Sequence, residues 1–166
     1  KEEFLQKGFL DASLQEICKN AGVTTGALYK RFKGKEELFC ALVENTVQDL
    51  EEVVRQKSAL PTTLTDEQLK KAWDMDREYM QWWFDYLYDR YDEMRLLLVF
   101  SDGTKYANFE HEWVESMSHT TYAYYKEAQR RGLTKTDISE KELHVMLSSF
   151  WTAICEPLIH GFTKEE

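Results

Sequence analysis

The sequence predicts an all-α protein, and three features of its composition and patterning support this prediction. The chain of 166 residues contains two prolines and seven glycines, so few positions interrupt a helix. Apolar residues recur at intervals of three and four over long stretches, which is the period of an amphipathic helix. Residues that cap helices, among them Ser13 and Ser139, stand immediately before several of these stretches. We therefore expect a small N-terminal domain of three helices, followed by a larger helical domain.

The segment from residue 13 to residue 38 predicts two short helices around a tight turn. Ser13 and Glu16 have the spacing of a capping box, so a helix is expected to begin there. Gly22 is expected to end that helix, because glycine adopts the left-handed backbone conformation at little cost. Thr24 or Thr25 then caps a second short helix. Two helices joined by a turn that contains glycine form a helix-turn-helix.

The small N-terminal core is expected to draw on the helices on either side of this turn. A first helix, with Phe4 and Phe9 on its apolar face, is expected to end at Gly8. The packing of the helix-turn-helix itself is assigned to five apolar residues, Ile17, Ala21, Val23, Leu28 and Phe32.

A local excess of positive charge surrounds the helix-turn-helix. The whole chain carries a formal charge of -9, but residues 17–35 contain no aspartate or glutamate. Five cations lie in this stretch: Lys19, Lys30, Arg31, Lys33 and Lys35. Because phosphate contacts dominate the affinity of proteins for DNA, a helix-turn-helix with such surroundings predicts a DNA-reading domain.

The residues of this segment resemble those of TetR-family transcriptional regulators. The resemblance rests on the run Gly22-Val23-Thr24-Thr25-Gly26-Ala27-Leu28-Tyr29, on Phe32, and on the run Lys35-Glu36-Glu37-Leu38-Phe39. The preceding residues, 7–17, also resemble the family's entry into its second helix. This likeness implies a homodimeric regulator, in most cases a repressor, that binds a palindromic double-stranded DNA operator and responds to a small-molecule effector.

The same resemblance assigns the contacts with DNA to the second short helix and its surroundings. Threonine hydroxyls can bond a phosphate or a base edge, and the Ala27 methyl group can touch a thymine methyl group. Arg31 can bind guanine through two hydrogen bonds, Tyr29 can bond a phosphate, and Lys30 adds charge rather than specificity. The predicted DNA-binding residues are Thr24, Thr25, Ala27, Tyr29, Lys30, Arg31 and Lys35.

A long helix from residue 35 to about residue 56 is expected to connect the two domains. It is apolar on two faces, so it should contact the DNA-reading domain on one side and the C-terminal body on the other. A linker is expected over residues 57–66, where Pro61 and several hydroxyl residues occur. We assign residues 1–45 to the DNA-binding domain, with an incomplete first helix. Residues 46–166 form the effector-binding and dimerisation domain, whose final helix is expected to be missing.

The C-terminal body is acidic and rich in aromatic residues, which are expected to surround an effector pocket between helices. One helix is expected over residues 67–91 and another over residues 105–131, each with an aromatic stripe at helical spacing. Ordinary core packing explains most such residues, but a pocket between helices uses the same types. The predicted ligand-binding residues are Asp76, Met80, Trp83, Tyr86, Phe109, Trp113, Met117 and Tyr124. With Asp76, Glu112 or Glu115 nearby, the ligand is expected to be flat or cationic.

The last helix is expected to begin at a capping box formed by Ser139 and Glu142, and to kink or end near residue 153 because of Pro157. In the TetR family the last two long helices form the dimer interface. The residues expected in that interface are Leu143, Leu147, Phe150, Trp151, Ile154 and Leu158.

Other classes of protein receive less support from the sequence. The three cysteines lack the spacing of a metal site, and the row His111, Glu115 and His119 is more typical of a solvated helix face. No catalytic motif is visible, so neither an enzyme nor a cofactor is expected. No apolar run approaches the ~20 residues that span a membrane, and a cytoplasmic location is expected. A helical protein-interaction module is the alternative, but it leaves the acid-free basic stretch unexplained.

Overall fold

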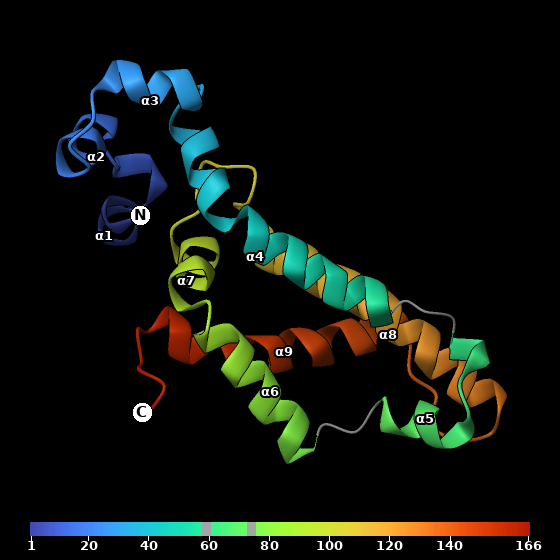
Figure 1. Cartoon of the computed structure of the whole chain (residues 1–166). Coiled ribbons are helices and arrows are strands. Elements are labelled where there is room, and N and C mark those ends of the chain that lie inside the picture. Colours follow the sequence, from blue (N-terminus) through green and yellow to red (C-terminus); the bar gives the residue numbers. More distant parts are fainter. Residues whose placement is uncertain (58–60, 73–75) are drawn as a thin grey trace. The chain divides into compact units, whose positions relative to one another are not determined.

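The computed structural model describes residues 1–57, 61–72 and 76–166, and every regular element in these ranges is a helix (Figure 1). This confirms the predicted all-α class. The elements in chain order are α1 (Glu2–Asp11), α2 (Leu14–Asn20), α3 (Thr25–Arg31), α4 (Lys35–Lys57), the 3-10 turn η1 (Pro61–Thr63), α5 (Asp66–Lys71), α6 (Arg77–Tyr88), α7 (Tyr91–Val99), α8 (Phe109–Arg130) and α9 (Glu140–Ile159).

The chain forms two compact units, and each is made of two separate stretches of the sequence. Unit 1 contains residues 1–49 together with residues 90–110, and unit 2 contains residues 50–89 and 111–166. The long helix α4 therefore begins in unit 1 and ends in unit 2, as does α8. The sequence had placed residues 90–110 with the C-terminal body, whereas they pack with the N-terminal helices.

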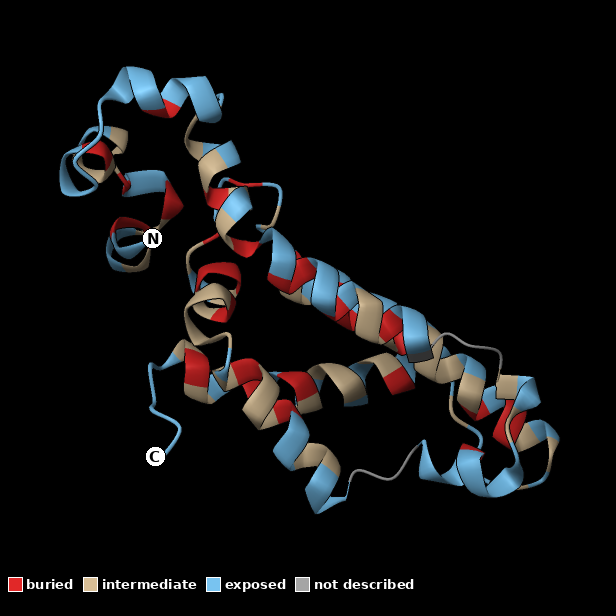
Figure 2. Ribbon diagram, in the orientation of Figure 1, coloured by how far each residue is buried: buried red, intermediate tan, exposed pale blue. Residues whose placement is uncertain are grey.

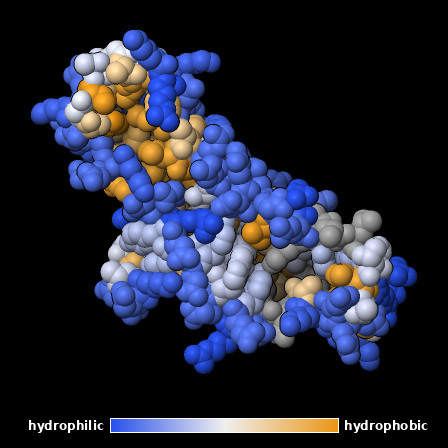
Figure 3. Space-filling view, in the orientation of Figure 1, coloured by the Kyte–Doolittle hydropathy of each residue, from blue (hydrophilic) through white to orange (hydrophobic). Residues whose placement is uncertain are grey.

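The core of unit 1 is built around three phenylalanines from α1 and α4. Phe4 and Phe39 are completely buried, and their rings meet edge to face with centroids 5.2 Å apart. Phe9 contacts the same Phe39 ring with centroids 5.6 Å apart. Buried residues lie on the inward sides of these helices, and apolar side chains gather where α1 to α4 face one another (Figures 2 and 3). This aromatic cluster holds α1 against the first turns of α4.

Helix α1 bends at Gly8 rather than ending there. Gly8 has a φ of 72° and a ψ of 172°, outside the helical region, yet helical geometry resumes and continues to Asp11. A positive φ of this kind favours glycine, which has no Cβ. The sequence correctly located the break in the helix, but the expectation that Gly8 ends it was wrong.

The N-terminus of α2 is capped, but only half of the predicted capping box is present. The Ser13 side chain accepts a hydrogen bond from the Glu16 backbone N–H, as expected. The Ser13 N–H, however, donates to Glu3 at 3.1 Å, and Glu16 lies 3.5 Å from Lys19. Glu3 is buried, and the Lys7 ammonium group and the Ser13 N–H lower the pKa of its carboxyl group. A carboxylate from α1 thus replaces Glu16 and ties α1 to α2.

Residues 90–110 are bound to α1 and α4 by several contacts within unit 1. The Phe9 N–H donates to the Phe100 carbonyl at 3.0 Å, and the Lys1 ammonium group lies 2.8 Å from Glu93. In addition, the Lys105 N–H donates to the Glu36 carboxylate at 3.0 Å. A stretch that follows α6 in the chain is therefore a structural part of the N-terminal unit.

In unit 2, the single helix expected over residues 67–91 is instead two helices, α5 and α6. Thr65 begins α5 with a complete capping box, in which Gln68 is the reciprocal partner. Asp76 begins α6, and its carboxylate accepts a hydrogen bond from the Tyr79 N–H at 2.8 Å. An N-cap aspartate accepts a hydrogen bond from a backbone N–H group of the first turn, which has no partner within the helix, and this favours a helix start at Asp76. The linker expected over residues 57–66 lies partly outside the described residues. Trp73, which belongs to the aromatic stripe expected over residues 67–91, lies outside them as well.

Helix α9 begins at the complete capping box of Ser139 and Glu142, as the sequence predicted. It continues past Pro157 to Ile159, so the proline does not end the helix near residue 153. Proline removes one backbone donor and clashes with the turn before it. Here it occupies the last turn, so few residues of helix follow it.

An arginine at the end of α8 fixes the segment that precedes α5. Arg131 donates to the backbone carbonyls of Leu64 and Thr62, at 2.6 Å and 3.1 Å, and to the Asp66 carboxylate at 3.0 Å. Its Nε donates to Glu127 at 2.6 Å, and Arg130 binds the same carboxylate. These two guanidinium groups lower the pKa of Glu127 to about 2.

None of the helices within the described ranges is long and apolar enough to cross a membrane.

Candidate nucleic-acid interface and ligand cavity

The turn and the second short helix adopt the local geometry that the sequence predicted. Gly22 has a φ of 65°, and the Val23 N–H donates back to the Cys18 carbonyl, which closes the end of α2. Thr24 caps α3, because its hydroxyl oxygen accepts a hydrogen bond from the Ala27 N–H at 3.1 Å. Leu28 is the buried residue of α3 and anchors the helix to unit 1.

The core of the helix-turn-helix differs from the expectation at two positions. Ala21 is exposed and Val23 is 46% exposed, so neither packs the two helices together. Cys18 and Ala12 are buried in their place.

Six of the seven predicted DNA-binding residues are exposed, and we call this set the α3 surface. It consists of Thr24, Thr25, Ala27, Tyr29, Lys30 and Arg31, and all six are exposed. Tyr29 is 56% exposed, although a large aromatic ring is often buried in a core. The structure thus leaves these side chains exposed on and next to a helix whose buried residue is Leu28.

The α3 surface is positively charged and largely without acidic partners. Lys19 is close to Glu16, but no ion pair involving Lys30, Arg31 or Lys33 is found in the part of the chain that the structure describes. Arg31 lies over the Phe32 ring, 5.5 Å from its centroid. These three cations can therefore meet an external anion without first breaking an internal ion pair.

Lys35, the seventh predicted contact, has a structural role within unit 1. Its ammonium group donates to the carbonyls of Leu10 and Ala12, at 2.8 Å and 3.0 Å, and lies 4.8 Å from the centroid of the Phe9 ring. The carbonyls at the end of a helix lack partners within the helix, so a cation there stabilises it. Lys35 thus joins the end of α1 to the start of α4, and its contact with DNA stays a prediction.

The substitution Lys35→Met tests this structural role. Methionine keeps the apolar stem over Phe9 but removes both hydrogen bonds, so we expect the free energy of unfolding to fall by about 1–2 kcal/mol. Lys33→Met, at an exposed lysine two residues earlier, is the control and should change stability by less than about 0.5 kcal/mol. Chemical denaturation followed by circular dichroism measures both. Unchanged stability of Lys35→Met together with weaker DNA binding would instead make Lys35 a phosphate contact.

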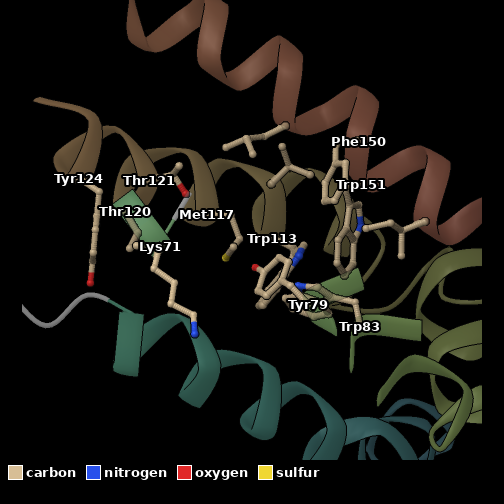
Figure 4. Close-up of a pocket in the computed structure, with 14 residues that line it drawn as sticks. Lys71, Tyr79, Trp83, Trp113, Met117, Thr120, Thr121, Tyr124, Phe150 and Trp151 are labelled. Atoms are coloured by element: carbon tan, nitrogen blue, oxygen red, sulfur yellow. The ribbon is translucent and has the colours of Figure 1, made fainter. Parts of the chain in front are cut away.

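Unit 2 contains a cavity of about 210 Å³ between α5, α6, α8 and α9 (Figure 4). Trp83, Trp113 and Trp151 lie together at one end of it, while Lys71 and Tyr124 lie at the other. The three indole rings contact one another, with centroid separations of 5.4 to 6.3 Å. The full lining is Lys71, Ala72, Tyr79, Trp83, Trp113, Val114, Met117, Thr120, Thr121, Tyr124, Leu147, Phe150, Trp151 and Ile154.

Only half of the predicted ligand-binding residues line this cavity. Trp83, Trp113, Met117 and Tyr124 do so. The other four do not line it. Asp76 caps α6 and is exposed, and Phe109 belongs to unit 1. The two remaining residues, Met80 and Tyr86, belong to α6 but are absent from the lining.

The residues predicted for a dimer interface are mostly in the interior of unit 2. Leu143, Trp151, Ile154 and Leu158 are each at most 6% exposed. Leu147, Phe150, Trp151 and Ile154 line the cavity. Their burial within one chain leaves little surface for a partner, and a dimer contact through these residues stays a prediction. The exposed apolar side chains of α9 are instead Val145 and Met146, at 63% and 60% exposure.

Two side chains of α8, one of them from the histidine row, lie close to polar groups of α9. His119 lies 3.2 Å from the Glu140 carboxylate, and Ser118 lies 3.1 Å from His144. Over the described ranges, no group of three possible ligands is arranged to hold a metal ion.

A helix-turn-helix whose second helix is exposed, cationic and anchored from one side has the local structure of a DNA-binding element. Comparison with known proteins gives a partial match to one family. Residues 1–42 match the family described as bacterial regulatory proteins, tetR family, which is the family that the motif resembles.

Individual relatives match part of the chain. The chain is 38% identical over 71 residues to the HTH-type transcriptional activator FasR of Mycolicibacterium smegmatis, which is 43% of this chain and 32% of FasR. It is 44% identical over 50 residues to the HTH-type transcriptional regulator AcrR of Shigella flexneri, which is 30% of this chain and 23% of AcrR. The match to SrpR of Pseudomonas putida is 42% over 50 residues and covers 24% of that protein. The chain thus matches about a third or less of each relative's length.

Proposed function

We propose that this protein is a ligand-responsive repressor that binds a palindromic operator as a homodimer in the cytoplasm. The observation that carries the proposal is the α3 surface, where hydroxyl, methyl, phenol and guanidinium groups are exposed together on one short helix. Such a set suits the major groove, where bases present acceptors, donors and the thymine methyl group. If these side chains belonged to a hydrophobic core, most of them would be buried.

Within the groove, we assign different roles to the residues of the α3 surface. The Thr24 hydroxyl oxygen already accepts the Ala27 N–H, so its hydroxyl hydrogen remains to donate to a phosphate oxygen. Arg31 can reach guanine through two parallel hydrogen bonds, whereas Lys30 and Lys33 supply charge near the phosphates. Position along DNA then comes from the phosphate contacts, and sequence preference comes mainly from Arg31 and Ala27.

We propose that ligand binding in the cavity of unit 2 is coupled to α3 through two connections of the chain. One is α4, which belongs to both units, and the other is residues 90–110, which follow α6 directly and are bound to α1 and α4. Trp83 of α6 forms part of the cavity wall. A ligand that displaces α6 would therefore also shift residues 90–110, which follow α6 and are bound to α1. The ligand changes DNA affinity only if it prefers one of the two arrangements.

For the homodimer we propose the outer face of α9. Val145 and Met146 are exposed there, and the smaller side chains of Ser149, Thr152 and Ala153 are exposed on the same helix. Two copies that meet through this face would form an isologous contact with two-fold symmetry. Two α3 helices related by that axis would read half-sites separated by about one turn of DNA or a multiple of it.

Selection of bound duplexes from a random pool tests the proposal. We expect an enriched palindromic motif, because two-fold symmetry in the protein is mirrored in its site. The same selection with the Arg31→Ala variant should lose the preference at one base position in each half-site. Enrichment of a single asymmetric half-site would reject the homodimer, and no enrichment would reject sequence-specific DNA binding.

A further inference from the structure

Among the residues that the structure describes, the only charged side chain on the wall of the cavity is a lysine. A cationic ligand was expected because Asp76, Glu112 and Glu115 occur near the aromatic stripes. In the structure Asp76 caps α6, Glu112 and Glu115 are exposed, and none of the three lines the cavity. Lys71, at the end of α5, does line it. A bound cation would therefore lose its water and meet a like charge, which is costly.

The two ends of the cavity differ in polarity (Figure 4). One end is formed by three indole rings, those of Trp83, Trp113 and Trp151. The indole nitrogens of Trp113 and Trp151 have essentially no accessible surface, so a ligand meets only the carbon atoms of these two rings. The side chains at the opposite end are polar: Lys71, Thr120, Thr121 and Tyr124. A ligand that suits both ends has an apolar body and a polar head.

The Lys71 ammonium group can pair with an anionic head. In the part of the chain that the structure describes, this group has neither an ion pair nor a hydrogen bond. Lys71 is exposed, and a lysine has a flexible four-carbon stem, so its ammonium group can turn toward a ligand without a change in the backbone. A carboxylate at this end of the cavity would gain a charge-assisted hydrogen bond.

The helix that carries Lys71 is held in place within unit 2. Leu69, two residues earlier in α5, is completely buried. At the other end of this short helix, Arg131 of α8 donates to the Asp66 carboxylate at 3.0 Å. The backbone of Lys71 is therefore fixed beside the cavity before a ligand binds. Binding then loses less conformational entropy than it would if α5 had to be ordered.

The size of the cavity limits the ligand to a compact molecule. Its volume of about 210 Å³ exceeds that of the engineered cavity of ~150 Å³ that accommodates benzene. It is smaller than the ~300–1,000 Å³ of pockets that hold drug-sized ligands. The cavity therefore accommodates one ring with a short substituent. Contacts with the flat rings of Trp83, Trp113 and Trp151 favour an aromatic ring over a saturated one.

We propose that the effector of this regulator is a compact aromatic carboxylate, whose ring packs against the tryptophans and whose carboxylate pairs with the Lys71 ammonium group. The inference rests on the ligand-responsive function proposed above and names the chemical class of its ligand. The aromatic ring occupies the end of the cavity that offers carbon atoms. The carboxylate supplies the counter-charge for the one charged side chain of the described lining.

Four probes of related shape test this class: phenylacetate, phenylacetamide, cyclohexylacetate and 2-phenylethylammonium. Phenylacetamide has nearly the shape of phenylacetate but no charge, and we expect phenylacetate to bind about 5- to 10-fold more tightly. Cyclohexylacetate keeps the charge but lacks the aromatic ring, and it should bind about 2- to 10-fold more weakly than phenylacetate. The cation 2-phenylethylammonium should bind most weakly. Isothermal titration calorimetry measures the four affinities.

Substitutions of Lys71 connect the preference to its charge. Lys71→Met removes the ammonium group but keeps most of the stem, so phenylacetate should lose most of its advantage over phenylacetamide. Lys71→Arg keeps the positive charge and should retain the advantage. Because the advantage is a ratio of two ligands on one variant, a general loosening of the cavity cancels.

Lys70→Met is the matched control for Lys71→Met. Lys70 is the preceding residue of α5, it is exposed, and it does not line the cavity. The control makes the same change in net charge on the same helix, so it should leave the ratio of the two affinities unaltered.

The outcomes separate the ligand class from the regulatory function. Equal binding of phenylacetate and phenylacetamide would overturn the proposal, and so would an equal loss of the ratio in Lys70→Met and Lys71→Met. Tightest binding by 2-phenylethylammonium or cyclohexylacetate, or no binding by any probe, would overturn it as well. DNA binding of the unmodified chain is measured separately with the selected duplex. Its absence rejects the regulator, whereas phenylacetate that binds as predicted without changing DNA affinity rejects only the coupling.

Discussion

Replacing Phe39 by alanine is expected to destabilise unit 1 by about 3–5 kcal/mol, the usual cost of removing a buried phenylalanine side chain. Phe39 is completely buried, and its ring is in contact with both Phe4 and Phe9 from α1. The loss is large compared with the ~5–15 kcal/mol that stabilises a typical domain. We expect a lower midpoint in chemical denaturation and a loss of DNA binding at temperatures where unit 1 unfolds.

Two further variants make this expectation specific. Phe39→Leu retains most of the buried volume and should cost considerably less than Phe39→Ala. Phe162→Ala removes a phenylalanine that is 48% exposed, and it should change the free energy of unfolding by less than about 0.5 kcal/mol. If Phe39→Ala were no more destabilising than Phe162→Ala, the aromatic cluster would not be the element that holds α1 to α4.

Local signals in the sequence were sufficient for the ends of the helices. The caps formed by Thr24 and Ser139, and the reversal at Gly22, depend on residues within three or four positions of one another. Such contacts are readable from spacing alone. The start of α3 also determines which of its side chains face outward, while the contact of these side chains with DNA stays a prediction.

Contacts between distant segments were not readable in the same way. Glu3 replaced Glu16 at the cap of α2 because α1 folds against that cap, ten residues away in the chain. Residues 90–110 joined unit 1 for a similar reason, through Phe100 and Lys105. Periodicity shows that a segment has an apolar face but not which segment covers it.

The cavity shows the same limit most clearly. An aspartate within an apolar stripe was interpreted as a ligand contact, although aspartate is also a favoured N-cap residue, and Asp76 is one. The apolar stripe of α9 was assigned to a partner chain, but Leu147, Phe150 and Ile154 face the cavity in their own chain. Val145 and Met146 lie beside the main apolar stripe of α9 and are exposed. These two residues were the signal in the sequence for a separate apolar face on this helix.

The paired substitution of Tyr29 and Arg31 by alanine should nearly abolish specific DNA binding while leaving the fold intact. Both side chains are exposed on α3, and neither contributes to the phenylalanine core, so stability should change little. Each lost contact is expected to cost ~1–3 kcal/mol per half-site, or roughly 5- to 150-fold in Kd. Fluorescence anisotropy with the selected duplex measures the loss, and circular dichroism confirms that the helices remain.

The dependence of binding on salt then distinguishes the two single variants. If Tyr29 and Arg31 have the assigned roles, Tyr29→Ala weakens binding to all duplexes, whereas Arg31→Ala relaxes the preference for guanine at one position. If Arg31 instead binds a phosphate, its loss lowers the salt slope by about one and leaves sequence preference intact. Arg55→Ala is the matched control, because it makes the same change in net charge at a side chain that is 75% exposed and bound to Glu52 in α4. Since Arg55 lies outside the α3 surface, an equal loss of DNA binding in Arg55→Ala and Arg31→Ala would mean that overall charge, rather than the α3 surface, determines affinity.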